Sequence, residues 1–291
     1  MPAQLILIYY FGVPARFIYK RCAQFHYRLK TRPLMATVEN GILKTKVDSW
    51  NELSTFTRYF SDDLGFIFRG QADSAWKLET SLNRFLNKTD PKLKNNTVYD
   101  FHLRNFRESI RGRGVKTTGL SDNELWALGQ HYGLFTPLLD WSFSFHISLY
   151  FAFIEEIKPV NGYRTIFALH RQGVTDRVKE YNKEKTEHDK FDIVESMSDE
   201  NPRIINQAGL FTKIPLDFNL QHWVHDQFKG MTKGYFFIIE INDKERMRIL
   251  KELNLMNINP KTVFPDLHGS SMNCNHKLML NADKAVNTLK I

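Results

Sequence analysis

Apolar residues recur at the three- and four-residue spacing of a helix in four stretches of the chain. The first stretch holds Trp50, Leu53, Phe56 and Phe60, and it begins with Ser49-Trp-Asn-Glu52, a sequence typical of an amino-terminal capping box. The other stretches span residues 98–110, 121–131 and 144–154, and Ser121-Asp-Asn-Glu124 is a second capping-box sequence. We therefore predict four amphipathic helices in this part of the chain.

Short apolar runs between and after these helices predict strands. The runs are Phe66–Phe68, Thr136–Trp141, Tyr163–Leu169 and Tyr235–Ile241, and residues 75–78 are expected to continue the sheet. No regular βαβ repeat is visible, which favours a single mixed α+β domain over a doubly wound sheet. We expect residues 35–291 to form this domain, with a central, mostly antiparallel or mixed sheet flanked by helices. The densely charged residues 175–192 are expected to be a solvated helix or an insert.

Much of the positive charge lies at the amino terminus. The net charge is +8, and residues 1–34 contain six basic residues and no Asp or Glu: Arg16, Lys20, Arg21, Arg28, Lys30 and Arg32. Three interpretations stay open for residues 1–34: a dispensable or spurious extension before a start at Met35, a targeting or membrane-surface segment, and a true first strand and helix. The rest of the chain is close to neutral, so its composition does not indicate a nucleic-acid-binding body.

Composition predicts a soluble, cytoplasmic protein. The chain is 42% hydrophobic, enough for a core, and no apolar run reaches the ~18 residues of a membrane span. Two cysteines, Cys22 and Cys274, are too few for a disulfide framework and favour a reducing compartment.

Two motif-like sequences do not predict sites. Residues 112–117 resemble a phosphate-binding loop but lack its glycine and lysine spacing. His222 and His225 lie within one turn of a predicted helix, and Cys274 and His276 form a second pair, yet no further ligand stands at zinc-site spacing. We therefore predict no metal site.

Arg69 is the first candidate site residue. It follows the predicted buried strand Phe66–Phe68 and precedes Gly70, which lets another backbone approach closely. Its guanidinium could bind a phosphate or carboxylate through two donors, or it could form a buried ion pair with Asp140.

Residues 130–153 hold the other candidates, because polar groups there are surrounded by apolar ones. His131 ends a predicted helix and could act as an acid or base beside the aromatic platform of Tyr132, or it could hydrogen-bond a loop carbonyl. Asp140 is either a cap or turn acceptor or a carboxylate that orients a ligand. Tyr150 lies on an apolar helix stripe and is either a core residue or a ligand contact.

Together these motifs resemble the FRG domain family. The resemblance is carried by Phe68-Arg-Gly70, Gln130-His-Tyr-Gly133, Thr136-Pro-Leu-Leu-Asp-Trp141 and Leu149-Tyr-Phe-Ala152, and by Arg203 with Gln207-Ala-Gly-Leu-Phe-Thr212. It extends over residues 47–280. Many relatives have Pro at the position of Phe135 and Arg at that of Pro137, so this chain lacks the second arginine of a doubly positive phosphate site. The spread of the family among bacteria, phages and mobile elements implies a part in stress or phage conflict.

The order of Arg69, Thr136–Ser144 and Gln207 is also similar to ADP-ribosyltransferases, which place equivalent residue types on successive core strands. That similarity implies NAD as a substrate and no other cofactor. It implies that His131, Asp140 and Gln207 are catalytic and that the ligand contacts are Arg69, Gln71, Gln130, Tyr132, Thr136, Trp141, Ser142, Tyr150 and Arg203. Gly209 stands where a Gln-x-Glu pair would have its acid, which argues against catalysis by this route.

Three functions are therefore considered. The leading one is binding of a nucleotide-like ligand such as NAD in a cleft around Arg69 and His131, with ADP-ribose transfer or NAD hydrolysis as its chemistry. The second is a non-catalytic protein-interaction module in which the same polar residues stabilise the core. The third, nucleic-acid binding through the basic residues 1–34, is least favoured because the remaining chain is nearly neutral.

Overall fold

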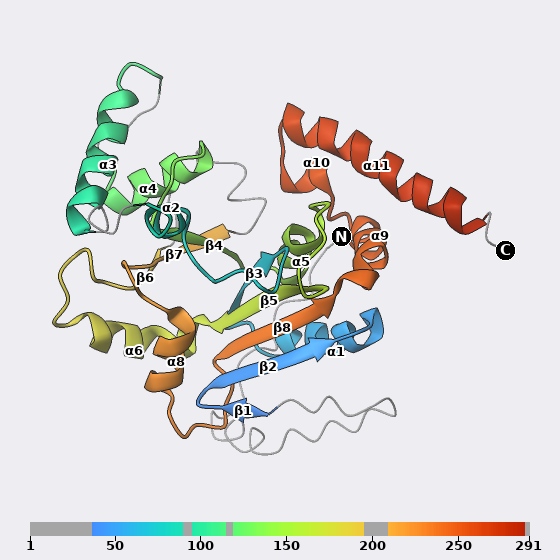
Figure 1. Cartoon of the computed structure of the whole chain (residues 1–291), viewed down its shortest axis with the longest axis horizontal. Coiled ribbons are helices and arrows are strands. Elements are labelled where there is room, and N and C mark those ends of the chain that lie inside the picture. The colour runs from blue at the N-terminus through green and yellow to red at the C-terminus, as the bar shows by residue number, and fades with distance from the viewer. Residues whose placement is uncertain (1–36, 90–94, 115–118, 195–208, 289–291) are drawn as a thin grey trace, which may run out of the picture. The chain divides into compact units, whose positions relative to one another are not determined.

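The computed structural model of this chain describes residues 37–89, 95–114, 119–194 and 209–288 (Figure 1). Eight strands of the described residues form one sheet, in the order β1-β2-β8-β5-β3-β4-β7-β6. They are β1 (Val38–Glu39), β2 (Ile42–Val47), β3 (Phe66–Gln71), β4 (Leu138–Ser142), β5 (Tyr163–His170), β6 (Asp192–Val194), β7 (Gly209–Lys213) and β8 (Phe236–Asn242). Among the described strands, only β2 and β8 pair in parallel, so the predicted mixed, mostly antiparallel α+β sheet is confirmed. Residues 1–34 lie outside the described residues.

Helices flank this sheet. They are α1 (Trp50–Ser61), α2 (Ser81–Leu86), α3 (Asn96–Ser109), α4 (Asp122–His131), α5 (Phe145–Phe153), α6 (Arg171–Asn182), α8 (Leu220–Gln227), the 3-10 turn η3 (Asp243–Glu245), α9 (Arg246–Leu255), α10 (Pro260–Val263) and α11 (Leu267–Thr288). In the part of the chain that the structure describes, none of them is both long and apolar enough to cross a membrane.

The two helix starts predicted from capping-box sequences are confirmed. Ser49 accepts a hydrogen bond from the Glu52 amide at the start of α1. Ser121 and Glu124 form a full capping box at the start of α4. Residues 75–78, by contrast, form a loop and not the predicted strand. The Gln71 side chain donates to the carbonyls of residues 76 and 77, at 3.2 and 3.1 Å, and holds that loop against β3.

An aromatic core lies where α1 and α5 pack on the sheet. The Phe60 ring lies 4.8 Å from that of Phe68 and 5.0 Å from that of Phe66, between ring centroids. Phe145 of α5 and Phe237 of β8 pack on the same ring at 5.4 and 5.6 Å. Since side chains alternate along a strand, Phe66, Phe68 and Gly70 of β3 all face this layer.

Ile67 faces the opposite layer, where α6 and α8 pack on the sheet with Val174, Val178 and Trp223. The charged stretch predicted from residue 175 therefore belongs partly to α6, whose two buried valines make it a packed amphipathic helix. By the same alternation, Arg69 and Gln71 leave β3 on the Ile67 face.

A third cluster packs α2, α3 and α4 on Leu138 of β4 and Phe211 of β7. Leu82, Leu103, Leu125 and Trp126 are its main helical members, and all are buried. This cluster fixes α4 against β4, and it therefore determines where the last turn of α4 meets the sheet.

Helix α5 ends in a buried environment where two arginines satisfy its terminal carbonyls. Arg164 of β5 donates to the Ala152 and Ile157 oxygens at 2.7 and 2.8 Å. Arg246 of α9 donates to the oxygens of residues 153 and 154 at 2.9 and 3.0 Å. The negative end of the helix dipole favours cations at this position.

Buried histidines predict a pH-dependent stability. His276 of α11 is buried, and neither ring nitrogen has a hydrogen-bond partner in the described part of the chain. Burial, and then the charge of Arg246, lower the pKa of His276 below its usual 6.5. Burial also lowers the pKa of His146. Above pH 6.5 both histidines are mainly neutral in the folded and in the unfolded state, so they do not lower the free energy of unfolding. As pH falls below 6.5 the unfolded chain takes up the protons first, so stability falls until the lowered pKa values are reached.

We expect His276→Leu to flatten this acid-side slope by up to about 1.4 kcal/mol per pH unit, because one titrating group is removed. Urea unfolding at pH 7.5, 6.5 and 5.5 measures it. His222→Leu is the control, since the His222 side chain is 74% exposed. An unchanged slope in the His276 variant would contradict the assignment.

Candidate functional site

The ladder between β3 and β4 has one register pair, Phe68 with Ser142. Beyond this pair the two strands no longer form a regular ladder, and the next residue of β3 is Arg69. A side chain, and not backbone pairing, therefore joins the strands at this end. All residues of β3 and β4 belong to the part of the chain that the structure describes.

Arg69 makes that connection. Its Nη1 donates to the Asp140 carbonyl oxygen at 2.8 Å and lies 3.5 Å from the Asp140 Oδ2. The Arg69 side chain is 21% exposed and that of Asp140 is 62% exposed. An ion pair with so exposed a carboxylate contributes no more than about 1 kcal/mol, so the shorter bond to the carbonyl is the main structural contact.

The guanidinium keeps an unused donor. Arg69 Nε is buried and has no hydrogen-bond partner within the described residues. Burial lowers the pKa of Arg69, the contacts with Asp140 raise it, and the positive charge of Arg84 lowers it. An arginine still remains protonated in a protein, so a desolvated cationic donor stands at this position.

Gln130 connects the end of α4 to this pair. Its Nε2 donates to Asp140 Oδ1, and its Oε1 accepts from the hydroxyl of Thr136. Thr136 is fully buried, and its amide donates to Ser81 Oγ of α2 at 3.0 Å. One network therefore joins α2, α4, β4 and β3, and it fixes the orientation of the Asp140 carboxylate.

His131 and Tyr132 lie beside this network. Their rings are 4.8 Å apart between centroids and nearly perpendicular. His131 is half-buried, whereas Tyr132 is the C-cap residue of α4 and is exposed. It is Gln130 that contacts Asp140, so the last turn of α4 brings an amide to the carboxylate.

Several other predicted contacts lie in the core. Trp141 is buried, and its Nε1 donates to the Thr212 hydroxyl at 2.9 Å. Ser142 is buried and accepts from the Ser144 amide. Tyr150 has no exposed surface, its hydroxyl has no partner in the described part of the chain, and burial raises its pKa. We leave Trp141, Ser142 and Tyr150 out of the ligand contacts because each of these side chains is buried as a whole, whereas the Arg69 side chain is 21% exposed.

Gln71 is buried too, and its amide holds the loop of residues 72–80. Arg203 and Gln207 lie outside the described residues. Ser81 and Arg84 were not among the predicted site residues. The motif that begins at Thr136 predicted an extended strand. The hydrogen bond from the Thr136 amide to Ser81 on α2, by contrast, depends on the tertiary fold.

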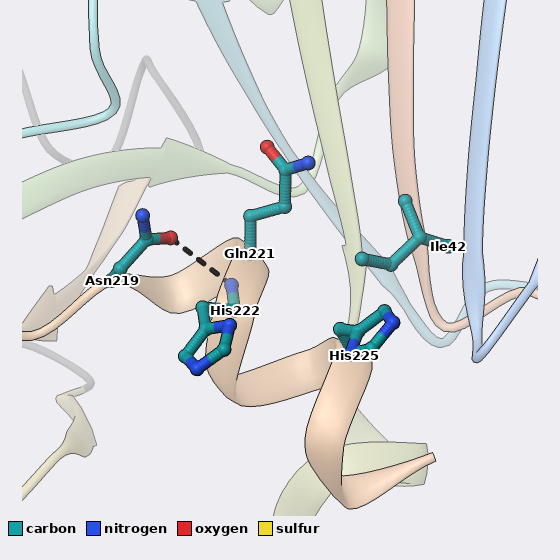
Figure 2. Close-up of a pocket in the computed structure, with 5 residues that line it drawn as sticks. All are labelled: Ile42, Asn219, Gln221, His222 and His225. Carbon is teal, nitrogen blue, oxygen red and sulfur yellow. Dashed lines mark hydrogen bonds between the residues drawn. The ribbon is translucent and has the colours of Figure 1, made fainter. Parts of the chain in front are cut away.

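A hollow lies between β2 and α8, away from Arg69 in the sequence, and is lined by Ile42, Asn219, Gln221, His222 and His225 (Figure 2). Both histidines already have partners: His222 lies 3.2 Å from Asp226, and His225 lies 2.7 Å from the Asn40 amide nitrogen and 3.1 Å from Asp226. Across the described ranges, no three His, Cys, Asp or Glu side chains are grouped so as to hold a metal ion.

Comparison with known protein families identifies part of the chain. Residues 65–160 match the model of the FRG domain. No curated protein and no solved structure matches the chain. The matched range contains Arg69, Ser81, Gln130, Thr136 and Asp140, and therefore every member of the hydrogen-bonded network described above.

Proposed function

We propose that this chain, which contains an FRG domain over residues 65–160, binds the phosphate of a nucleotide-like ligand at Arg69. The observation that supports this most directly is that the Arg69 side chain is 21% exposed while its Nε lacks an acceptor among the described residues. An unsatisfied buried donor costs about 1–3 kcal/mol, and a phosphate oxygen would remove that penalty. The Nε and Nη2 edge of a guanidinium suits two phosphate oxygens, while Nη1 stays on Asp140.

The neighbouring groups suit the sugar of such a ligand. Asp140 is exposed and held in one orientation by Gln130, so its carboxylate can accept hydrogen bonds from ribose hydroxyls. His131 and Tyr132 lie next to Gln130 at the end of α4 and can supply a proton-transfer group and an aromatic face. NAD is the first ligand to test, with ADP-ribose transfer and NAD hydrolysis as the reactions to look for.

Arg69→Lys tests the proposal, because lysine keeps the charge but cannot present two parallel donors. We expect NAD to raise the melting temperature of the native protein and Arg69→Lys to weaken NAD binding about 10- to 100-fold, the equivalent of one or two charge-assisted bonds. Calorimetric titration measures the affinity, and chromatography of the products detects turnover. Arg248→Lys, at an exposed position on α9, is the matched control.

A native protein that is not stabilised by millimolar NAD, or an Arg69→Lys variant that binds NAD as tightly, would overturn the proposal. The bond from Arg69 to a backbone carbonyl favours the second candidate, a non-catalytic interaction module, because it gives the arginine a structural role. In that case Arg69→Lys lowers the melting temperature and NAD has no effect on either protein.

A further inference from the structure

Helix α11 packs on α10 and α9 with a face that is poor in apolar side chains (Figure 1). Up to residue 282, its buried positions follow one helical face: Gly269, Asn273, His276 and Leu280. Only the last of these four is a large apolar residue. The facing helix α9, by contrast, buries three aliphatic side chains: Ile249, Leu250 and Leu253. The hydrophobic effect therefore holds α11 less firmly than it holds α9.

Two of the buried side chains of α11 lack hydrogen-bond partners. Neither ring nitrogen of His276 is bonded within the part of the chain that the structure describes, and nor is Oδ1 of Asn273. Both residues are more than nine-tenths buried, at 4% and 8% exposure. In a detached α11 these three atoms would bond to water, so they destabilise the packed arrangement relative to the detached one.

A fixed positive charge lies at the same face. Nη1 and Nη2 of Arg246 on α9 are each 3.8 Å from Met279 Sδ, and Met279 is one turn beyond His276. Arg246 also donates to the carbonyl oxygens of residues 153 and 154, which keeps its guanidinium in place. Burial, and then this charge, lower the pKa of His276. A proton on His276 would therefore be buried beside a cation, and the detached state would be favoured.

Other ionisable groups around this face do not offset the charge of Arg246. Glu156 lies 3.9 Å from Arg246 Nη2, but its side chain is 72% exposed. On α9, Lys251 and Glu252 are half-buried and carry opposite charges. The remaining ionisable side chains of α9, α10 and α11 up to residue 282 are exposed: Arg248, Lys261, His268, Cys274 and Lys277.

The first turn of α11, by contrast, is held closely on α10. The Gly269 amide donates to Asp266 Oδ1 at 2.9 Å. A Cβ at Gly269 would lie 2.7 Å from the Pro260 carbonyl oxygen and closer still to that of Phe264. Loss of packing is therefore expected beyond this turn, where Asn273 and His276 lie.

We infer that α11 beyond Gly269 is an acid-released arm, which detaches from α9 while the sheet stays folded and which is favoured in its detached form when His276 takes up a proton. Detachment would uncover the Arg246 guanidinium. A single helix of this length is marginal in water, so the detached arm would lose its helical hydrogen bonds and its amides would exchange with solvent. The inference does not depend on the ligand proposed at Arg69.

Amide hydrogen exchange of the full chain tests the arm. The observed rate divided by the intrinsic rate at each pH gives an opening constant for α11 and, as a reference, for β5 and β8. We expect α11 to open more readily than these strands, and its opening constant to rise about three- to tenfold from pH 6.5 to 5.5, since the detached state binds up to one more proton. Equal opening constants in α11 and the strands, or no such rise in α11, would overturn the inference.

Two variants at His276 separate charge from packing. His276→Gln keeps a polar side chain that does not titrate, so α11 should still open locally but without the rise at acid pH. His276→Leu should also lower the opening constant at pH 7.5, by about fivefold or more, because the unpartnered ring nitrogens are removed. His222→Gln is the matched control, since that side chain is 74% exposed, and it should behave as the native protein does. An acid rise that persists in either His276 variant would also overturn the inference.

Discussion

Replacing Gly70 with alanine is expected to lower the free energy of unfolding by more than about 3 kcal/mol, above the usual range for adding one methylene to a packed core. A Cβ at Gly70 would lie 2.7 Å from the Ala152 amide nitrogen and closer still to the Ser148 carbonyl oxygen. Both are backbone atoms of α5, so no side-chain rotation can make room. The strand and the helix would have to separate, and the aromatic core between them would loosen. Urea unfolding measures the change.

Gly112→Ala is the matched control for this prediction. Nothing lies within 4 Å of a Cβ at Gly112, and its φ is +73°. The same added methyl there should cost only the about 1–2 kcal/mol of the left-handed backbone conformation. If Gly70→Ala unfolds at the same urea concentration as Gly112→Ala or later, close packing of α5 on β3 is not what requires the glycine.

Arg164→Met is expected to destabilise the protein by about 3–5 kcal/mol, as is usual when one member of a buried ion pair is removed. Arg164 is fully buried, and its Nε lies 2.6 Å from Asp243 Oδ1. Its two Nη atoms donate to the Ala152 and Ile157 carbonyls, so methionine would leave one carboxylate and two carbonyls without this donor. Thermal and urea unfolding measure the effect.

Two variants sharpen this test. Arg164→Lys keeps the charge but cannot reach three acceptors from one nitrogen, so its loss of stability should fall between native and Arg164→Met. Arg248→Met removes an exposed arginine of α9, whose contact with Asn51 is 3.4 Å, and should change stability by less than about 0.5 kcal/mol. If Arg164→Met is as stable as Arg248→Met, the buried arginine does not hold the end of α5.

The Phe68-Arg-Gly70 motif contains three residues with three different environments. Phe68 packs in the aromatic core with α1 and α5. Arg69 points to the other face and joins β3 to β4. Gly70 lets α5 lie directly on the strand. The sequence interpretation assigned the glycine to close approach of another backbone, and that backbone is the helix of the same domain.

Local pattern was a reliable guide wherever the cause of the structure is local. The capping residues Ser49 and Ser121 predicted the starts of α1 and α4 because a cap satisfies amides three residues away. The residues that carry the FRG resemblance also predicted the family match, over a longer range than the 65–160 that match.

Long-range pairing was harder to predict. The pairing of Arg69 with Asp140 was one of two alternatives, and its geometry shows that the backbone carbonyl is the closer acceptor. Ser81 and Gln130 complete the network, yet they are 55 and 6 residues from Thr136 and no sequence spacing links them. The buried Arg164 was missed altogether, because a single arginine in an apolar strand gives no sign of the helix end that it meets.

The amino-acid sequence by itself determined the four predicted amphipathic helices, four of the eight strands, the mixed α+β class and the match of residues 65–160 to the FRG domain model, since these follow from periodicity, capping and motif order over short distances. Only the tertiary structure decided which polar groups meet. Hydrogen bonds across elements depend on how β3, β4, α2 and α4 pack, and that packing depends on the whole core.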